Sequence, residues 1–158
     1  MQYNIESLLS GKGIVIKACM PKAGIAPILE KMGELNRNGT VVQAFDSSAI
    51  INKEHLLFAY ANASIAKAEK RNRASSAALE MLCFAALTMQ ISDAIRICGA
   101  KEGSKMVIFS NSRAAYKKIE GMLSSVGEFR RSDGALERLG ALSFEDVLQK
   151  MALLNISD

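Results

Sequence analysis

The chain of 158 residues is 49% hydrophobic and carries a formal net charge of +4, with an isoelectric point near 9.0. This length and composition fit one domain with a substantial core, so residues 1–158 are expected to form a single globular unit. A charge of this size, with 6% aromatic residues and no tryptophan, argues against an extended base-stacking platform for nucleic acid. Any contact with RNA should therefore be small and local.

Membrane insertion and secretion are not indicated. The longest apolar stretch, Met81 to Met89, falls far short of the roughly 20 residues that cross a bilayer. Residues 1–13 lack the basic start, apolar run and cleavage site of a secretory signal, so we expect a cytoplasmic protein. The cysteines show no Cys-x-x-Cys spacing and are expected to be buried thiols, without metal or redox chemistry. They are Cys19, Cys83 and Cys98.

The first part of the chain predicts a strand, a helix and a second strand. Residues 13–20 are rich in β-branched side chains and are followed by a proline, which suits a strand that ends there. Apolar residues then recur at helical spacing as far as about Asn36. Asn38 and Gly39 form a turn signal, and residues 40–45 have the composition of a strand.

Two helices are predicted next. Asn52 can cap a helix that runs to about Lys70. Ser75 or Ser76 can cap the second helix, which is apolar almost all round from residue 77 to residue 89 and should be central or shared with a partner. Its core-facing stripe is predicted to consist of Leu79, Leu82, Cys83, Ala86, Leu87, Gln90, Ile91, Ala94, Ile95 and Cys98.

The last third predicts a strand at residues 105–110 and a helix that Ser112 caps and Gly127 ends. Residues 128–132 are expected to form a short edge strand, and a closing helix should follow the capping pattern of Ser143 and Asp146. Strands separated by helical crossovers predict an α/β or α+β domain, in which helices are layered on a small sheet.

A cluster of cations lies between the two central helices. Lys67, Lys70, Arg71 and Arg73 are opposed only by Glu69, which leaves a net charge of +3. Such a cluster favours a polyanionic partner. Cations also suit the negative C-terminal end of the preceding helix, and from these residues alone a solvated helix end is the preferred interpretation.

No catalytic grouping is recognisable. The single histidine, His55, has no partner for a triad or a common metal site. The glycine-containing segments match no phosphate loop, and the carboxylates show no paired spacing for acid and base chemistry. We therefore expect a protein that is not an enzyme, with no cofactor, metal or small-molecule substrate.

Four segments, in order and spacing, resemble the kinase-binding subunit of the KEOPS complex, the TPRKB-like family. They are Gln43–Asp46, His55–Ala63, Glu80–Leu82 and Gln90–Ile95, and the resemblance is strongest from Gln43 to Gly99. It implies a small mixed, mainly antiparallel sheet flanked by helices. It also implies a non-catalytic subunit that binds the complex's small kinase/ATPase and recruits tRNA through the single-stranded 3′ CCA end, supporting threonylcarbamoyladenosine modification.

The implied RNA site lies at His55, Leu56 and the hinge from Lys67 to Glu80. There the cations would meet phosphates, and Leu56 and Ala59 would floor a base pocket. His55 has two open roles, a packing residue or a ligand that stacks on or hydrogen-bonds to the RNA end. The expected RNA-binding residues are His55, Leu56, Ala59, Lys67, Lys70, Arg71, Asn72, Arg73, Ser75 and Glu80.

For the kinase contact the expected surface is the last helix, with Val147, Met151 and Leu154, because methionine adapts well at interfaces. Core packing of these three residues is an equal alternative. At the level of function, the main alternative is a protein-interaction module that regulates the kinase without touching RNA. A small enzyme ranks last.

Overall fold

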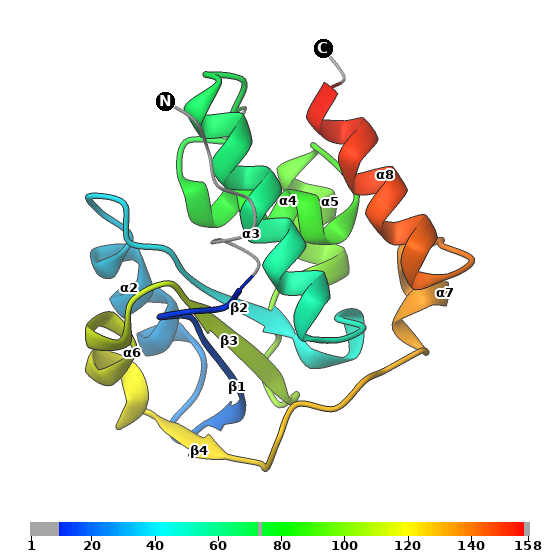
Figure 1. The fold of residues 1–158 in the computed structure, drawn as a ribbon. Helices are drawn as coiled ribbons and strands as arrows, with labels where there is room; N and C mark the ends of the chain where they lie inside the picture. Colours follow the sequence, from blue (N-terminus) through cyan, green and yellow to red (C-terminus); the bar gives the residue numbers. More distant parts are fainter. Residues whose placement is uncertain (1–9, 73, 157–158) are drawn as a thin grey trace.

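The protein is built on a four-stranded antiparallel sheet, which the computed structural model shows within residues 10–72 and 74–156, the part of the chain that it describes (Figure 1). The strand order is β2-β3-β1-β4, and every pairing is antiparallel. The mainly antiparallel sheet that was expected is confirmed; within the described part of the chain no two strands pair in parallel, so the sheet there is not mixed. The strands are β1 (Val15–Pro21), β2 (Val42–Asp46), β3 (Met106–Ser110) and β4 (Leu123–Ser125).

Helices cover both faces of this sheet (Figure 1), which confirms the predicted α/β domain. One face carries α2 (Ala26–Leu35) and α6 (Arg113–Glu120), and its core contains side chains from all four strands. The other face carries the remaining helices and the larger core. They are α3 (Lys53–Ala68), α4 (Ala77–Ala86), α5 (Ile91–Cys98), α7 (Ala135–Leu139) and α8 (Phe144–Ile156), with a short 3₁₀ turn η1 (Ser47–Ala49).

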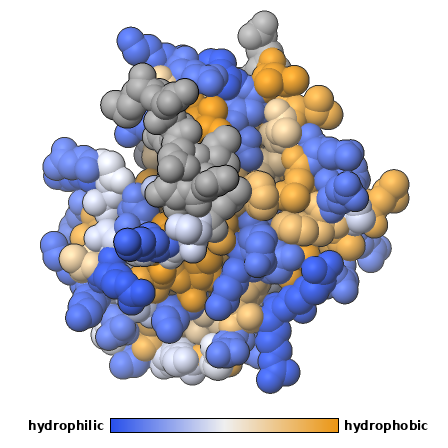
Figure 2. All heavy atoms as spheres, in the orientation of Figure 1, coloured by the Kyte–Doolittle hydropathy of each residue, from blue (hydrophilic) through white to orange (hydrophobic). Residues whose placement is uncertain are grey.

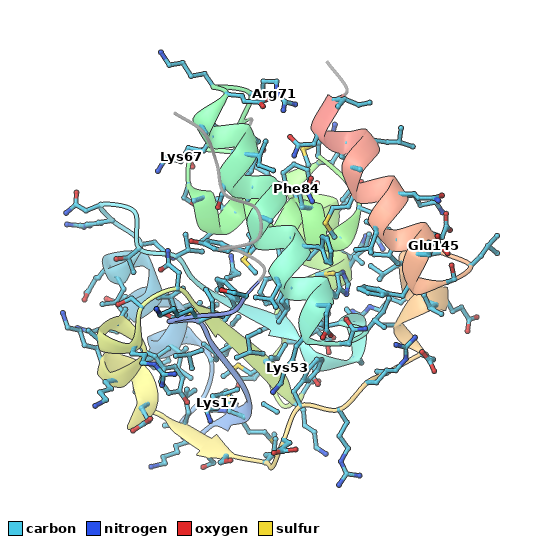
Figure 3. The ribbon with its side chains drawn as sticks, in the orientation of Figure 1. Lys17, Lys53, Lys67, Arg71, Phe84 and Glu145 are labelled. Atoms are coloured by element: carbon cyan, nitrogen blue, oxygen red, sulfur yellow. The ribbon has the colours of Figure 1, made fainter. Side chains whose placement is uncertain are left out.

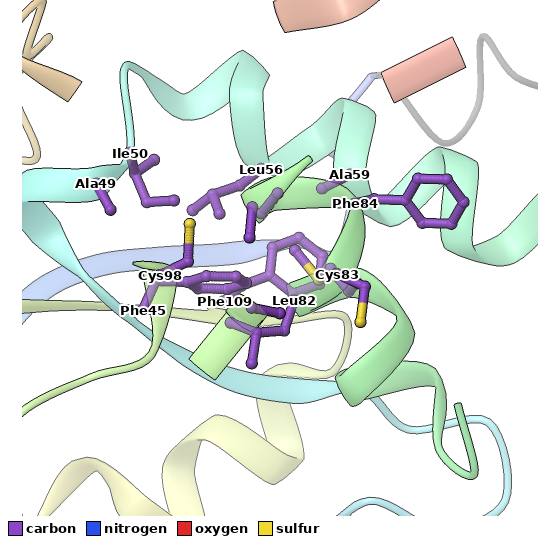
Figure 4. Close-up of a cluster of buried hydrophobic side chains, with 14 of the residues drawn as sticks. Phe45, Ala49, Ile50, Leu56, Ala59, Leu82, Cys83, Phe84, Cys98 and Phe109 are labelled. Carbon is purple, nitrogen blue, oxygen red and sulfur yellow. The ribbon is translucent and has the colours of Figure 1, made fainter. Parts of the chain in front are cut away.

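The larger core centres on α4, where eight of ten residues are buried, as the apolar composition of that segment predicted. In Figure 4, Phe45 and Phe109 of the sheet lie beside Leu56 of α3 and Leu82 of α4, and all four are buried. Small residues on α3 allow the two helices to approach closely. This packing fixes the connection between α3 and α4, which carries the predicted cations.

The second central helix is broken in two, which corrects the prediction of one stripe from Leu79 to Cys98. Leu87 adopts a left-handed conformation (φ 61°), and the N–H of Thr88 donates to the carbonyl of Cys83 at 3.1 Å, so α4 ends there. α5 starts at Ile91 with its axis bent by 68° from α4. As a result Gln90, Ile91 and Ile95, predicted to face the core, are exposed.

Two further predictions fail beyond β3. The helix that begins at Arg113 stops at Glu120, not Gly127, because the chain turns at Gly121 and returns as β4 beside Cys19–Pro21. Residues 128–132 are therefore an irregular connection and not an edge strand. The short helix α7 was not predicted.

The predicted caps are all present. In each case a side-chain oxygen accepts a hydrogen bond from a backbone N–H three residues later, which satisfies a donor at the helix start. The pairs are Asn52 with His55 (2.8 Å), Ser76 with Leu79 (3.1 Å), Ser112 with Ala115 (3.1 Å) and Ser143 with Asp146 (3.1 Å).

The three cysteines are buried and unpaired, as predicted. Burial raises the pKa of Cys19 and Cys83 to about 11 and that of Cys98 to about 12, so the thiols stay protonated at neutral pH. Among residues 10–72 and 74–156, no single helix is long and apolar enough to cross a membrane. α4 and α5 meet that length and composition only as a bent pair.

Candidate nucleic-acid interface

A groove lies between the α3–α4 connection and the turn that joins α2 to β2. We name it the hinge groove; its volume is about 150 Å³. Lys67 lies on this side of α3, while Arg71 is at the outer end of the connection (Figure 3). The described lining residues are Asn36, Arg37, Asn38, Gly39, Thr40, Ala63, Lys67, Asn72, Ser75, Ser76, Ala77 and Glu80. The groove thus brings together four of the predicted RNA-binding residues: Lys67, Asn72, Ser75 and Glu80.

One wall of the hinge groove is a turn that its own sequence makes rigid. The amide of Asn36 donates to the carbonyl of Val42 at 2.9 Å and accepts from its N–H at 2.7 Å. Asn38 and Gly39 then adopt positive φ angles of 53° and 84°, which these residue types tolerate. The result places Arg37, an exposed cation that the sequence reasoning missed, at the groove. The turn was predictable, but its place opposite α3 depends on tertiary packing.

The opposite wall is the start of α4, which Ser76 caps. Glu80 is 2% exposed, and its carboxylate accepts a hydrogen bond from the N–H of Ala74 at 2.7 Å. Asn72 donates to the carbonyl of Ala74 at 3.4 Å, a bond within the connection itself. Glu80 therefore shapes the hinge groove by holding the backbone of the connection in place.

Two further cations, Lys70 and Arg71, are not among the described residues that line the groove. Lys70 leaves α3 in a left-handed conformation (φ 57°), and the N–H of Arg71 closes the helix end on the carbonyl of Ala66 at 2.7 Å. The guanidinium of Arg71 pairs with the carboxylate of Glu69. Arg73 lies outside the described residues.

The structure places His55 in the core and so gives it the packing role, one of the two roles that the sequence left open. Its Nδ1 accepts from the N–H of Ile51 at 3.1 Å, and its Nε2 donates to the carbonyl of Ala85 at 2.9 Å, joining α3 to α4. Burial lowers the pKa of His55 to about 4, against the opposing effect of the Ala85 bond, so the ring is neutral. Its side chain is 0% exposed and cannot reach RNA at the surface.

Leu56 and Ala59 are also 0% exposed, because they face β2, β3 and α4 inside the larger core. The structure therefore corrects their assignment as the floor of a base pocket. Ala63, one helical turn further along the same face of α3, lines the hinge groove instead.

A second surface lies on α8. Val147 and Met151 are 0% exposed and pack in the larger core, so their assignment to a docking surface is corrected too. Leu154 is half-buried. The exposed apolar residues nearby are Leu142 (93% exposed), Leu153 (59%) and Ile156 (74%), and Figure 2 shows hydrophobic side chains over this edge of the molecule. We name these three residues and Leu154 together the α8 apolar face; Leu142 precedes the helix, and the other three lie in its last turn.

A family model described as kinase binding protein CGI-121 matches residues 25–141. The chain belongs to this family. It is the family of the KEOPS kinase-binding subunit, so the resemblance drawn from four short segments is confirmed. The match includes both walls of the hinge groove and ends just before the α8 apolar face. No curated protein matches the chain significantly.

Proposed function

We propose that this protein is a non-catalytic KEOPS subunit that binds the complex's small kinase/ATPase and holds the 3′ CCA end of tRNA in the hinge groove. It would thereby support threonylcarbamoyladenosine modification, whose chemistry belongs to other subunits. Membership of the CGI-121 family supports the kinase contact. The hinge groove supports the RNA contact.

The single observation that carries the RNA proposal is the chemistry gathered in that groove. Lys67 and Arg37 supply positive charge from two walls, and Asn72 and Ser75 supply hydrogen-bonding groups between them. Unstacked bases need such donors and acceptors on their edges, and phosphates need the cations. The groove is small, about 150 Å³, so its contact with RNA would be local.

The roles of the other candidates follow from their positions. The start of α4 adds the positive end of a helix dipole next to Ser75. Lys70, Arg71 and Arg73 would meet phosphates that follow the CCA end along the outer surface. Glu80 would act indirectly, through the connection that it holds.

For the kinase we propose the α8 apolar face. Exposed leucine and isoleucine side chains in one region are typical of interaction sites, because a monomer gains nothing from leaving them in water. Leu153, Leu154 and Ile156 on α8, with Leu142 before it, replace the buried Val147 and Met151 as the docking residues.

One observation favours a second candidate, a kinase-regulating module with no RNA contact. Arg71 already has a carboxylate partner in Glu69, and the cations of this segment suit the C-terminal end of α3. In that case the hinge cations would stabilise a helix end and bind nothing.

Binding of the purified protein to tRNA with and without its CCA tail, at two salt concentrations, separates the two candidates. We expect removal of the tail to weaken binding at least tenfold. Arg37→Glu combined with Lys67→Glu should do the same and lower the salt dependence. The matched control combines Lys22→Glu with Lys118→Glu, two exposed cations outside the groove. Equal binding with and without the tail would refute the CCA proposal.

A further inference from the structure

We propose that the open edge of β1 is a docking site for an extended, acidic segment of a partner protein, which would add to the sheet as a further strand. This site is separate from the hinge groove and from the α8 apolar face, and it does not depend on the function proposed above. Three features of this edge favour such a partner: the partly unpaired backbone of β1, two hollows beside it and the positive charge around them.

The backbone of β1 is only partly paired on its outer side. β3 pairs with Val15–Cys19 on the inner side, but β4 pairs only with Cys19–Pro21 on the outer side. The carbonyl of Ala18 accepts from the N–H of Val126 at 3.5 Å, so the outward-pointing groups belong to alternate residues that include Ile16. Within residues 10–72 and 74–156, no hydrogen bond reaches the outward N–H and C=O of Ile16. An added strand would satisfy both groups.

Two hollows flank this edge, one on each face of the sheet. The hollow on the α3 side has a volume of about 390 Å³ and that on the α6 side about 500 Å³. They share Val15, Lys17 and Arg113, so they meet along the edge of β1. Successive side chains of a strand point to opposite faces, so an added strand would place its side chains alternately in the two hollows. Apolar side chains line both: Ile14, Ile16 and Leu57 on the α3 side, and Val15 and Tyr116 on the α6 side.

The charge around the two hollows specifies an acidic occupant. Their described lining residues include four cations and two carboxylates, which leaves a net charge of +2. None of these six side chains forms an ion pair with another residue in the described ranges. Figure 3 shows Lys17 and Lys53 on the same side of the molecule. The cations are Lys17, Lys53, Arg113 and Lys117, and the carboxylates are Glu54 and Glu120.

The same charges disfavour a second copy of this chain as the occupant. If two β1 edges paired, Lys17 and Arg113 of one copy would approach those of the other, and like charges across a strand pair are destabilising. Lysine on an open edge is a known defence against such pairing. A segment with alternating apolar and acidic residues meets no such repulsion.

The test uses three fluorescein-labelled synthetic peptides and fluorescence anisotropy on the full chain. The acidic probe is Val-Glu-Val-Asp-Val-Glu, and the basic probe replaces its acids with lysine. The third probe replaces its two inner valines with proline, which keeps the charge but removes backbone donors and strand geometry. We expect the acidic probe to bind at least tenfold more tightly than either of the others.

Protein variants locate the binding. Ile16→Pro removes the outward N–H without touching the ladder to β3, and it should weaken acidic-probe binding about three- to tenfold. Lys17→Glu combined with Arg113→Glu should weaken it at least tenfold, and this variant decides the matter should Ile16→Pro fail to fold. The control, Lys22→Glu with Lys118→Glu, keeps the net charge equal to that of the double variant, and its binding should change less than twofold. Amide exchange at Ile16 should slow when the acidic probe is bound.

Three results would overturn the proposal. The first is equal binding of the proline probe, which would show charge attraction without strand addition. The second is the absence of binding by any of the three probes. The third is self-association in ultracentrifugation that Lys17→Glu alters, which would make a second copy the occupant.

Discussion

The two ends of α3 each carry an ionisable side chain that the sequence assigned to RNA binding, His55 at the start and Lys67 at the end, but the two have opposite roles. At its start, His55 is fully buried and joins α3 to α4 through two hydrogen bonds. At its end, Lys67 is exposed at the hinge groove and faces a turn from a distant part of the chain. The hydrogen bonds of His55 fix the start of α3 against its neighbours. Because the helix is held in this way, Lys67 at its other end has a defined position at the hinge groove. Polar character alone therefore does not mark a binding residue in this family member.

The largest effect on stability should follow from removing the buried His55 side chain at the start of α3. His55→Ala leaves the N–H of Ile51 and the carbonyl of Ala85 unsatisfied and creates a cavity, so we expect a loss of about 4 kcal/mol in the free energy of unfolding. Urea unfolding measures this loss. Ser64→Ala, on the same helix, is the control and should cost less than about 0.5 kcal/mol. A loss below 1 kcal/mol for His55→Ala would show that the two hydrogen bonds do not hold the helices together.

Lowering the pH should also destabilise the fold through His55. The pKa of His55 is lowered from 6.5 to about 4, so between these values the unfolded chain binds a proton that the folded protein does not. Its contribution is complete above pH 6.5 and is lost as the pH falls towards 4, by about 3 kcal/mol in total. Urea unfolding at several pH values should show this slope in the natural protein.

A His55→Leu variant should lack that slope between pH 6.5 and 4, and persistence of the slope would assign it to other groups.

Asp46 should contribute to the pH dependence of stability at lower pH values than His55. Burial tends to raise the pKa of Asp46, but hydrogen bonds from Ser48 and the charge of Arg138 lower it overall, so its contribution is lost only below about pH 3.8.

The contrast between buried and exposed positions recurs across α8. Leu153→Glu combined with Ile156→Glu should weaken kinase binding by about 2 kcal/mol or more and leave the melting temperature within 2 °C, because both side chains are exposed. Met151→Ala should instead lower the stability by about 3 kcal/mol. Calorimetric titration with the purified kinase and thermal unfolding separate these outcomes. Unchanged kinase affinity in the double variant would exclude the α8 apolar face.

The smallest effect concerns the wall of the hinge groove. Ser76→Ala removes the cap of α4 and should cost about 1 kcal/mol of stability. Because it loosens the start of α4, it should also weaken binding of the CCA end, while Ser112→Ala, the equivalent change on α6, should cost similar stability without that effect. Equal RNA affinity in both variants would show that the cap of α4 does not contribute to binding of the CCA end.

Much of the fold was predictable because its signals are local. The caps at Asn52, Ser76 and Ser112, and the turn at Asn38 and Gly39, depend on neighbouring residues and were identified. The end of α4 was missed because Leu87 adopts the left-handed conformation that glycine usually marks. β4 was missed because a three-residue strand depends on its partner β1 more than on its own sequence.

The site was predictable in part. The cations of the hinge follow directly from composition, whereas Arg37 reaches the groove only through the packing of α2 and β2 against α3. His55 was misleading because a histidine near a helix start has the same sequence signature whether it is buried or exposed. Burial of a single side chain depends on the whole core, which periodicity predicts only for apolar stripes.

The place of the tRNA end in the hinge groove can be tested by mapping amide chemical shifts during a titration with a short single-stranded RNA that ends in CCA. We expect the largest changes in the hinge groove and only small changes along the open edge of β1. The groove residues that should change most are Asn38, Gly39, Asn72, Ser75 and Ala77. The same RNA without its last three nucleotides should produce little change in the groove. Shifts elsewhere on the surface, or equal shifts with both RNAs, would contradict the claim that the hinge groove holds the tRNA end.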